Sequence, residues 1–187
     1  MTSYESPNNK SKEIPTEDLE EVESLRYDLS YLVYKIRSII GFNRLFSVLG
    51  KRIEESLNGL KGENDVNLNV LCKLEAELYC LSGALKKMDD KDADTIGTMQ
   101  KMLELLFAFN YQKQRMLKTA LKVVSRSSEF FGTRADLLQS GFKFLANCIN
   151  ITDLEDLASE SISNLCKNNK GFVLENMNDF VDCSLFL

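Results

Sequence analysis

Apolar residues recur at three- and four-residue steps through eight segments of the chain, the spacing that places side chains on one face of an α-helix. The most regular segment begins after Thr16, a predicted N-cap, and ends before Gly41. The residues expected to form its buried face are Leu19, Val22, Leu25, Leu29, Leu32, Val33, Ile36, Ile39 and Ile40. Because no proline follows Pro15, no proline ring interrupts the later helices. The pattern therefore predicts an all-α fold.

The other helices are predicted where the same periodicity resumes after a polar turn or a glycine. The expected segments are about Phe42–Leu57, Asn67–Met88, a helix after Asp89–Asp92 that runs to about Phe109, Tyr111–Phe131, Arg134–Ile149, a helix capped by Thr152, and a short last helix, with Met177, Phe180 and Val181, that Gly171 opens. Residues 1–15 are polar and lack periodicity, which predicts a disordered leader. Residues 16–187 are therefore expected to form one helical repeat domain.

The predicted helices fall into antiparallel pairs at a regular spacing. First helices of successive pairs begin near residues 17, 67, 111 and 153, so the spacing falls from about 50 to about 42 residues, close to the period of helix-pair repeats. We therefore predict an α-α superhelix, a solenoid of the HEAT or armadillo type with about four helix pairs, in preference to a compact four-helix bundle.

Composition narrows the function classes. The net charge of -5 and the pI near 5.0 disfavour nucleic-acid binding, which usually requires clustered lysines and arginines. No apolar stretch approaches the roughly 20 residues that span a bilayer, and the polar amino terminus is unlike a signal peptide, so neither membrane insertion nor secretion is expected. The five cysteines form no CxxC pair and are expected to be reduced core thiols: Cys72, Cys80, Cys148, Cys166 and Cys183.

Catalytic motifs are not found in the sequence. Histidine is absent, and neither a P-loop nor a GxGxxG motif occurs. Glu75 and Glu77 are the one acidic pair near the middle of a predicted helix, and no matching pair is predicted to face them. We therefore expect no enzymatic activity and no cofactor, although an enzyme that works through carboxylates in a helical bundle stays a third alternative.

Four segments resemble consecutive HEAT repeats of the karyopherin-β (importin-β) transport receptors. They run from Leu25 to Leu49, Leu74 to Met88, Leu117 to Ile149 and Leu157 to Val173. They are most similar, in order and spacing, to the central section of the importin-thirteen and transportin-SR branch. The residue pairs that carry the resemblance are Arg26 with Asp28, Glu75 with Ala76, Glu129 with Phe130, and Ile162 with Cys166, the last at a different spacing from the family pattern.

The resemblance implies a protein-binding module in protein transport between the cytoplasm and the nucleus. It implies protein cargo, Ran GTPase and Phe-Gly nucleoporins as partners, and it leaves open import or export. The alternative is a stand-alone α-helical adaptor or scaffold outside nuclear transport.

Two surfaces are candidates for protein contacts. If the solenoid is right, the second helix of each pair lines its concave face, which makes the charged residues there candidate partner contacts: Lys51, Glu54, Lys101, Glu104 and Lys143. The apolar tail VDCSLFL is a candidate for self-association.

Overall fold

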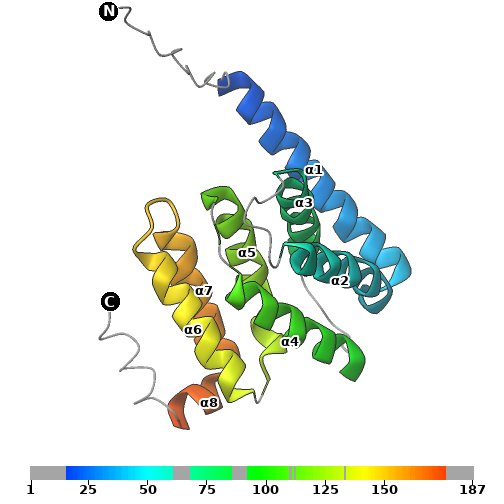
Figure 1. Ribbon diagram of the computed structural model, residues 1–187. Helices are drawn as coiled ribbons and strands as arrows, with labels where there is room; N and C mark the ends of the chain where they lie inside the picture. The colour runs from blue at the N-terminus through cyan, green and yellow to red at the C-terminus, as the bar shows by residue number, and fades with distance from the viewer. Residues whose placement is uncertain are drawn as a thin grey trace, which may run out of the picture.

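The computed structural model describes residues 16–60, 68–85, 92–109, 111, 113–132 and 134–175, and within them every regular element is a helix (Figure 1). The elements are α1 (Thr16–Ile40), α2 (Phe42–Gly59), α3 (Leu68–Ala84), α4 (Ala93–Ala108), α5 (Gln114–Arg126), the 3-10 turn η1 (Ser128–Phe130), α6 (Ala135–Ile149), α7 (Glu155–Asn168) and α8 (Lys170–Glu175). The all-α prediction is confirmed. The predicted leader, Met177, Phe180, Val181 and the VDCSLFL tail lie outside the described residues.

Helix boundaries follow local backbone chemistry. Gly41 separates α1 from α2 as predicted, with a φ of 83° that a side chain would strain. The predicted fifth helix is too long, since α5 ends at Arg126: the Ser127 hydroxyl donates to the carbonyls of Val123 and Val124, and η1 follows.

Two predicted start signals for the last helices are wrong. Thr152 is not a helix cap, because the chain turns at Asp153, with a φ of 70°, and α7 begins only at Glu155. The carbonyl of Thr152 instead accepts a hydrogen bond of 2.7 Å from the Gln114 side chain. Gly171 does not open α8 but lies within it.

Helices two positions apart along the chain are neighbours in space. One row packs in the order α1, α3, α5, α7, and a second row packs in the order α2, α4, α6 (Figure 1). Contacts of α2 with α3 and of α6 with α7 join the two rows. The core lies between the rows, where the side chains of Ile53, Leu78, Leu103, Leu121 and Leu138 are fully buried.

The apolar face of α1 does not face this core, contrary to the prediction. Seven of its residues are exposed, by between 37% and 82%: Val22, Leu25, Leu29, Leu32, Ile36, Ile39 and Ile40. Val33 is partly buried, and the side chain of Leu19 lies outside the description. The residues that pack on α3 are mainly polar: Arg26 and Arg37 donate hydrogen bonds to α3, and Ser30 is buried against Gly83. The periodicity identified the apolar face correctly, but α3 contacts the adjacent face.

Gly83 permits the close approach of α1 to α3. A Cβ atom at this position would lie 2.8 Å from the Ser30 carbonyl oxygen, a backbone atom that can move only with α1. We predict that Gly83→Ala lowers the free energy of unfolding by about 1–3 kcal/mol because the two helices must separate. Gly97→Ala is the matched control: a Cβ there meets nothing within 4 Å, so the substitution should raise stability by about 0.5–1 kcal/mol. Urea titration of both variants measures the difference, and equal effects would contradict the close contact.

Candidate partner-binding surfaces

An ion pair links the first three helices of the longer row. Arg26 of α1 donates two hydrogen bonds to the carboxylate of Glu75 on α3, one of them at 2.9 Å from Nη1 to Oε2. The hydroxyl of Thr119 on α5 donates to the same carboxylate at 2.6 Å. The Arg26 guanidinium also lies over the ring of Tyr79, 4.2 Å from its centroid. These contacts set the position of α1 relative to α3.

The environment of Glu75 favours its charged form. Burial alone would raise the pKa of Glu75. The hydrogen bonds from Arg26 and Thr119 and the positive charges of Arg26 and Arg115 outweigh burial and hold the pKa below its ordinary value of 4.5. Its neighbour Glu77 is buried and accepts a hydrogen bond of 2.9 Å from Ser56 of α2. The two carboxylates of the sequence-predicted acidic pair therefore take part in contacts between helices.

The five sequence-predicted contact residues are all exposed, on three helices of the second row. Lys51 and Glu54 lie on α2, Lys101 and Glu104 on α4, and Lys143 on α6. Glu104 and Lys143 line one hollow of about 430 Å³, together with Phe107, Asp136 and Phe144. Lys51, Glu54 and Lys101 are not among the residues that line it.

Arg134 pairs with two of the carboxylates that line this hollow. Its guanidinium lies 2.6 Å from the Glu104 carboxylate and also pairs with Asp136 at the start of α6. The hydrogen bond with Arg134 lowers the pKa of Asp136 to about 2, so that this carboxylate stays charged. The structure therefore places Glu104 in an ion-pair network between α4 and α6. Lys143 is an exposed cation that lines the same hollow.

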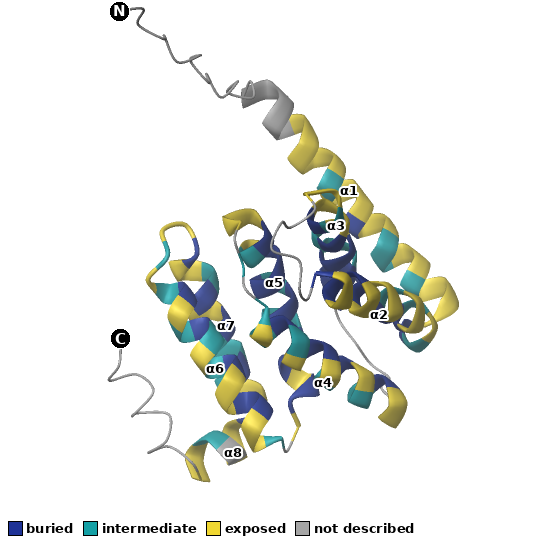
Figure 2. Cartoon of the chain, viewed as in Figure 1, coloured by how far each residue is buried: buried dark blue, intermediate teal, exposed yellow. Residues whose placement is uncertain are grey.

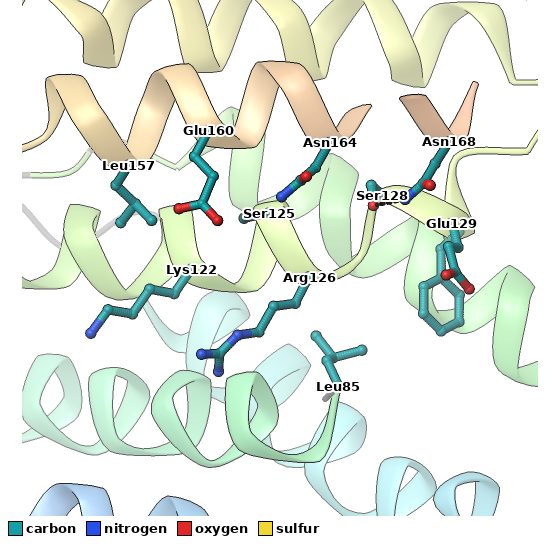
Figure 3. Close-up of a pocket in the computed structure, with 11 residues that line it drawn as sticks. Leu85, Lys122, Ser125, Arg126, Ser128, Glu129, Leu157, Glu160, Asn164 and Asn168 are labelled. Carbon is teal, nitrogen blue, oxygen red and sulfur yellow. Dashed lines mark hydrogen bonds between the residues drawn. The ribbon is translucent and has the colours of Figure 1, made fainter. Parts of the chain in front are cut away.

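A second, polar groove was not predicted from the sequence. It has a volume of about 380 Å³ and lies along α5, η1 and α7, with Lys122 and Arg126 on one side and Glu160, Asn164 and Asn168 on the other (Figure 3). Glu160 and Asn164 extend from α7 toward α5 (Figure 3). On each helix the lining residues are about one turn apart, so the sequence indicates that they share a face of that helix. The sequence does not indicate that these two faces lie against each other.

The cations of the groove are partly desolvated. Burial lowers the pKa of Arg126, whose Nη1 donates a hydrogen bond of 2.6 Å to the Ser82 carbonyl of α3. Burial also lowers the pKa of Lys122, and the nearby charge of Lys118 adds to that effect. Arg126 is thus committed to a contact within the fold, and the Lys122 ammonium lies 5.5 Å from the centroid of the Tyr79 ring on α3. Glu160 is exposed on the α7 side of the groove.

The cysteines differ from the predicted set of core thiols. Cys148 is buried, and burial raises its pKa to about 11, which disfavours the reactive thiolate. Cys80 and Cys166 are half-buried, whereas Cys72 is exposed, so the core prediction is wrong for Cys72. Cys183 lies outside the described residues. Over the described part of the chain, no group of three or more potential metal ligands is found, and no helix has the length and apolarity needed to cross a membrane.

Comparison of the chain with protein-family models, with curated proteins and with solved structures finds no match.

The charged state of Glu75 makes part of the stability depend on pH. Since its folded pKa is below the unfolded value, its contribution is complete above about pH 4.5 and is lost as the pH falls through the folded pKa. We predict that Glu75→Gln lowers the free energy of unfolding by about 2 kcal/mol at neutral pH. The difference from the unmodified chain should shrink on acidification below about pH 4.5.

Urea titrations across this pH range measure that difference. Glu54→Gln is the control, because Glu54 is exposed on α2 and should change stability by less than about 0.5 kcal/mol. A difference for Glu75→Gln that grows as the pH falls would contradict the assigned direction of the pKa.

Proposed function

We propose that the chain is a non-enzymatic protein-binding module of a nuclear transport receptor, built as a HEAT-like superhelix that acts between the cytoplasm and the nucleus. The observation that carries the proposal is the packing of alternate helices in two rows, α1, α3, α5, α7 and α2, α4, α6. Stacked helix pairs produce this order because each pair buries its faces on the next pair.

Three of the residues that carry the family resemblance, Arg26, Glu75 and Phe130, support the proposal through their contacts. Arg26 and Glu75 come from the first two resembling segments, and they form the ion pair between α1 and α3. Phe130, from the third segment, is buried, with its ring centroid 6.1 Å from that of Phe42 on α2. The ion pair thus lies at a contact between successive helix pairs, and Phe130 packs against a helix of the first pair.

Non-enzymatic action agrees with the roles of the buried polar residues. The carboxylates of Glu75 and Glu77 are engaged by Arg26, Thr119 and Ser56 within the fold. Stacked helix pairs form extended surfaces that bind other proteins, and exposed charges on them favour partners of complementary charge. The proposed partners are protein cargo, Ran GTPase and Phe-Gly nucleoporins. The proposed contacts are the exposed charged residues of the second row: Lys51, Glu54, Lys101, Glu104 and Lys143.

The alternative is a stand-alone adaptor or scaffold outside nuclear transport. It has the same fold and uses the same exposed helix faces, so partner identity separates the two functions. Affinity purification from cell extract with identification of the bound proteins, followed by binding measurements with purified Ran in its GTP and GDP forms and with a Phe-Gly repeat peptide, distinguishes them.

We predict that reversing the charge of the second-row lysines weakens binding of at least one transport partner. The double variant Lys101→Glu, Lys143→Glu should raise its Kd by about 10-fold or more, because both side chains are exposed on adjacent helices. Lys167→Glu, an exposed lysine of α7 in the other row, is the matched control and should leave the Kd unchanged.

Two results would count against the proposal. If the chain binds none of the Ran forms, the Phe-Gly peptide or any transport cargo, the adaptor alternative replaces the transport function. If a transport partner binds equally well to the double variant and to the unmodified chain, the assignment of the second row as the binding face is wrong.

A further inference from the structure

The exposed apolar residues of α1 follow a seven-residue repeat. We call Val22, Leu25, Leu29, Leu32, Ile36 and Ile39 the α1 stripe. Successive members are three, four, three, four and three residues apart, which is the spacing of the buried seam in a coiled coil. All six are exposed, from 37% for Ile36 to 82% for Ile39. Figure 2 shows exposed residues along most of the helix, which lies at the outer edge of the described structure.

The described part of the chain does not cover the α1 stripe. The residues of α1 that contact α3 include Arg26, Ser30 and Arg37, each one position after a stripe residue. One residue corresponds to a rotation of about 100° around a helix, so the stripe lies on the face of α1 next to the one that contacts α3. Its length from Val22 to Ile39 is roughly 26 Å at 1.5 Å per residue. An apolar surface of this length and regularity is typical of a protein interface.

We propose that the α1 stripe binds the α1 stripe of a second copy of this chain, in an antiparallel arrangement with two-fold symmetry. In this register Leu29 faces Leu32 of the second copy, Leu25 faces Ile36, and Val22 faces Ile39. Every stripe residue thereby meets an apolar partner, and the two-fold axis repeats each contact. The arrangement is independent of nuclear transport, since it involves only this chain.

The charges beside the stripe select the antiparallel direction. Asp28 and Lys35 are exposed and lie seven residues apart, on the same flank of the stripe. In an antiparallel pair this flank lies against the same flank of the second copy. Asp28 of each copy therefore lies beside Lys35 of the other copy. A parallel pair would instead place Asp28 beside Val33 and Lys35 beside Ile40. Only the antiparallel register pairs both charges.

The first experiment measures association directly. Sedimentation equilibrium of the full chain should show a dimer, and Leu32→Glu, which places a charge in the seam twice per dimer, should raise the dimer Kd by at least about 100-fold. Leu174→Glu is the matched control, because Leu174 of α8 is 60% exposed outside the stripe, and it should leave the Kd unchanged. Circular dichroism checks that both variants keep their helix content.

The second experiment tests the register. Asp28→Lys gives two lysines on the flank and Lys35→Asp gives two aspartates, so each variant alone should associate at least about 10-fold more weakly. Their mixture should form a heterodimer as tight as the original dimer, and the double variant should recover self-association. A monomer at all concentrations, or a dimer unaffected by Leu32→Glu, would overturn the proposal. A dimer insensitive to both charge reversals would overturn the antiparallel register.

Discussion

Helix α3 is buried on several sides, and this burial determines how its neighbours are arranged. Leu74, Leu78 and Leu81 of this helix are fully excluded from solvent, and α3 packs on α1, α2 and α5. A helix covered in this way needs neighbours from both rows, which fixes the alternation of helices in space. The buried polar residues of α3, Glu77 and Ser82, must then find partners inside the fold, because water hardly reaches them.

The ion pair of Arg26 with Glu75 follows from this constraint. Removing both groups from water costs free energy that is recovered only when hydrogen bonds satisfy them, and Thr119 supplies a further donor to the carboxylate. Such a contact is directional, whereas an apolar contact tolerates rotation. The polar face of α1 is therefore fixed against α3, and the apolar face is left outside as a consequence.

The sequence predicted the elements better than their contacts. Hydrophobic spacing and Gly41 located α1 and α2 closely, because periodicity and a positive φ are local properties. The end of α5 depended on hydrogen bonds of Ser127 that compete with the helix, and the buried face of α1 depended on Arg26 finding Glu75, 49 residues away. Likewise, Lys122 and Glu160 had no local signal that they share a groove. The exposure of all five predicted contact residues was predictable, since charged side chains rarely become buried without partners.

The two faces of α1 differ in how selective their contacts are. The face toward α3 uses hydrogen bonds from Arg26 and Arg37, which have few alternative geometries and so fix one orientation. The stripe on the adjacent face offers aliphatic side chains that would accept many apolar partners with similar free energy. Discrimination at such a surface must come from its margin, where like charges placed side by side are unfavourable. Asp28 and Lys35 lie seven residues apart at this margin and carry opposite charges. An antiparallel second copy would place unlike charges side by side there, whereas a uniformly charged flank would place like charges together.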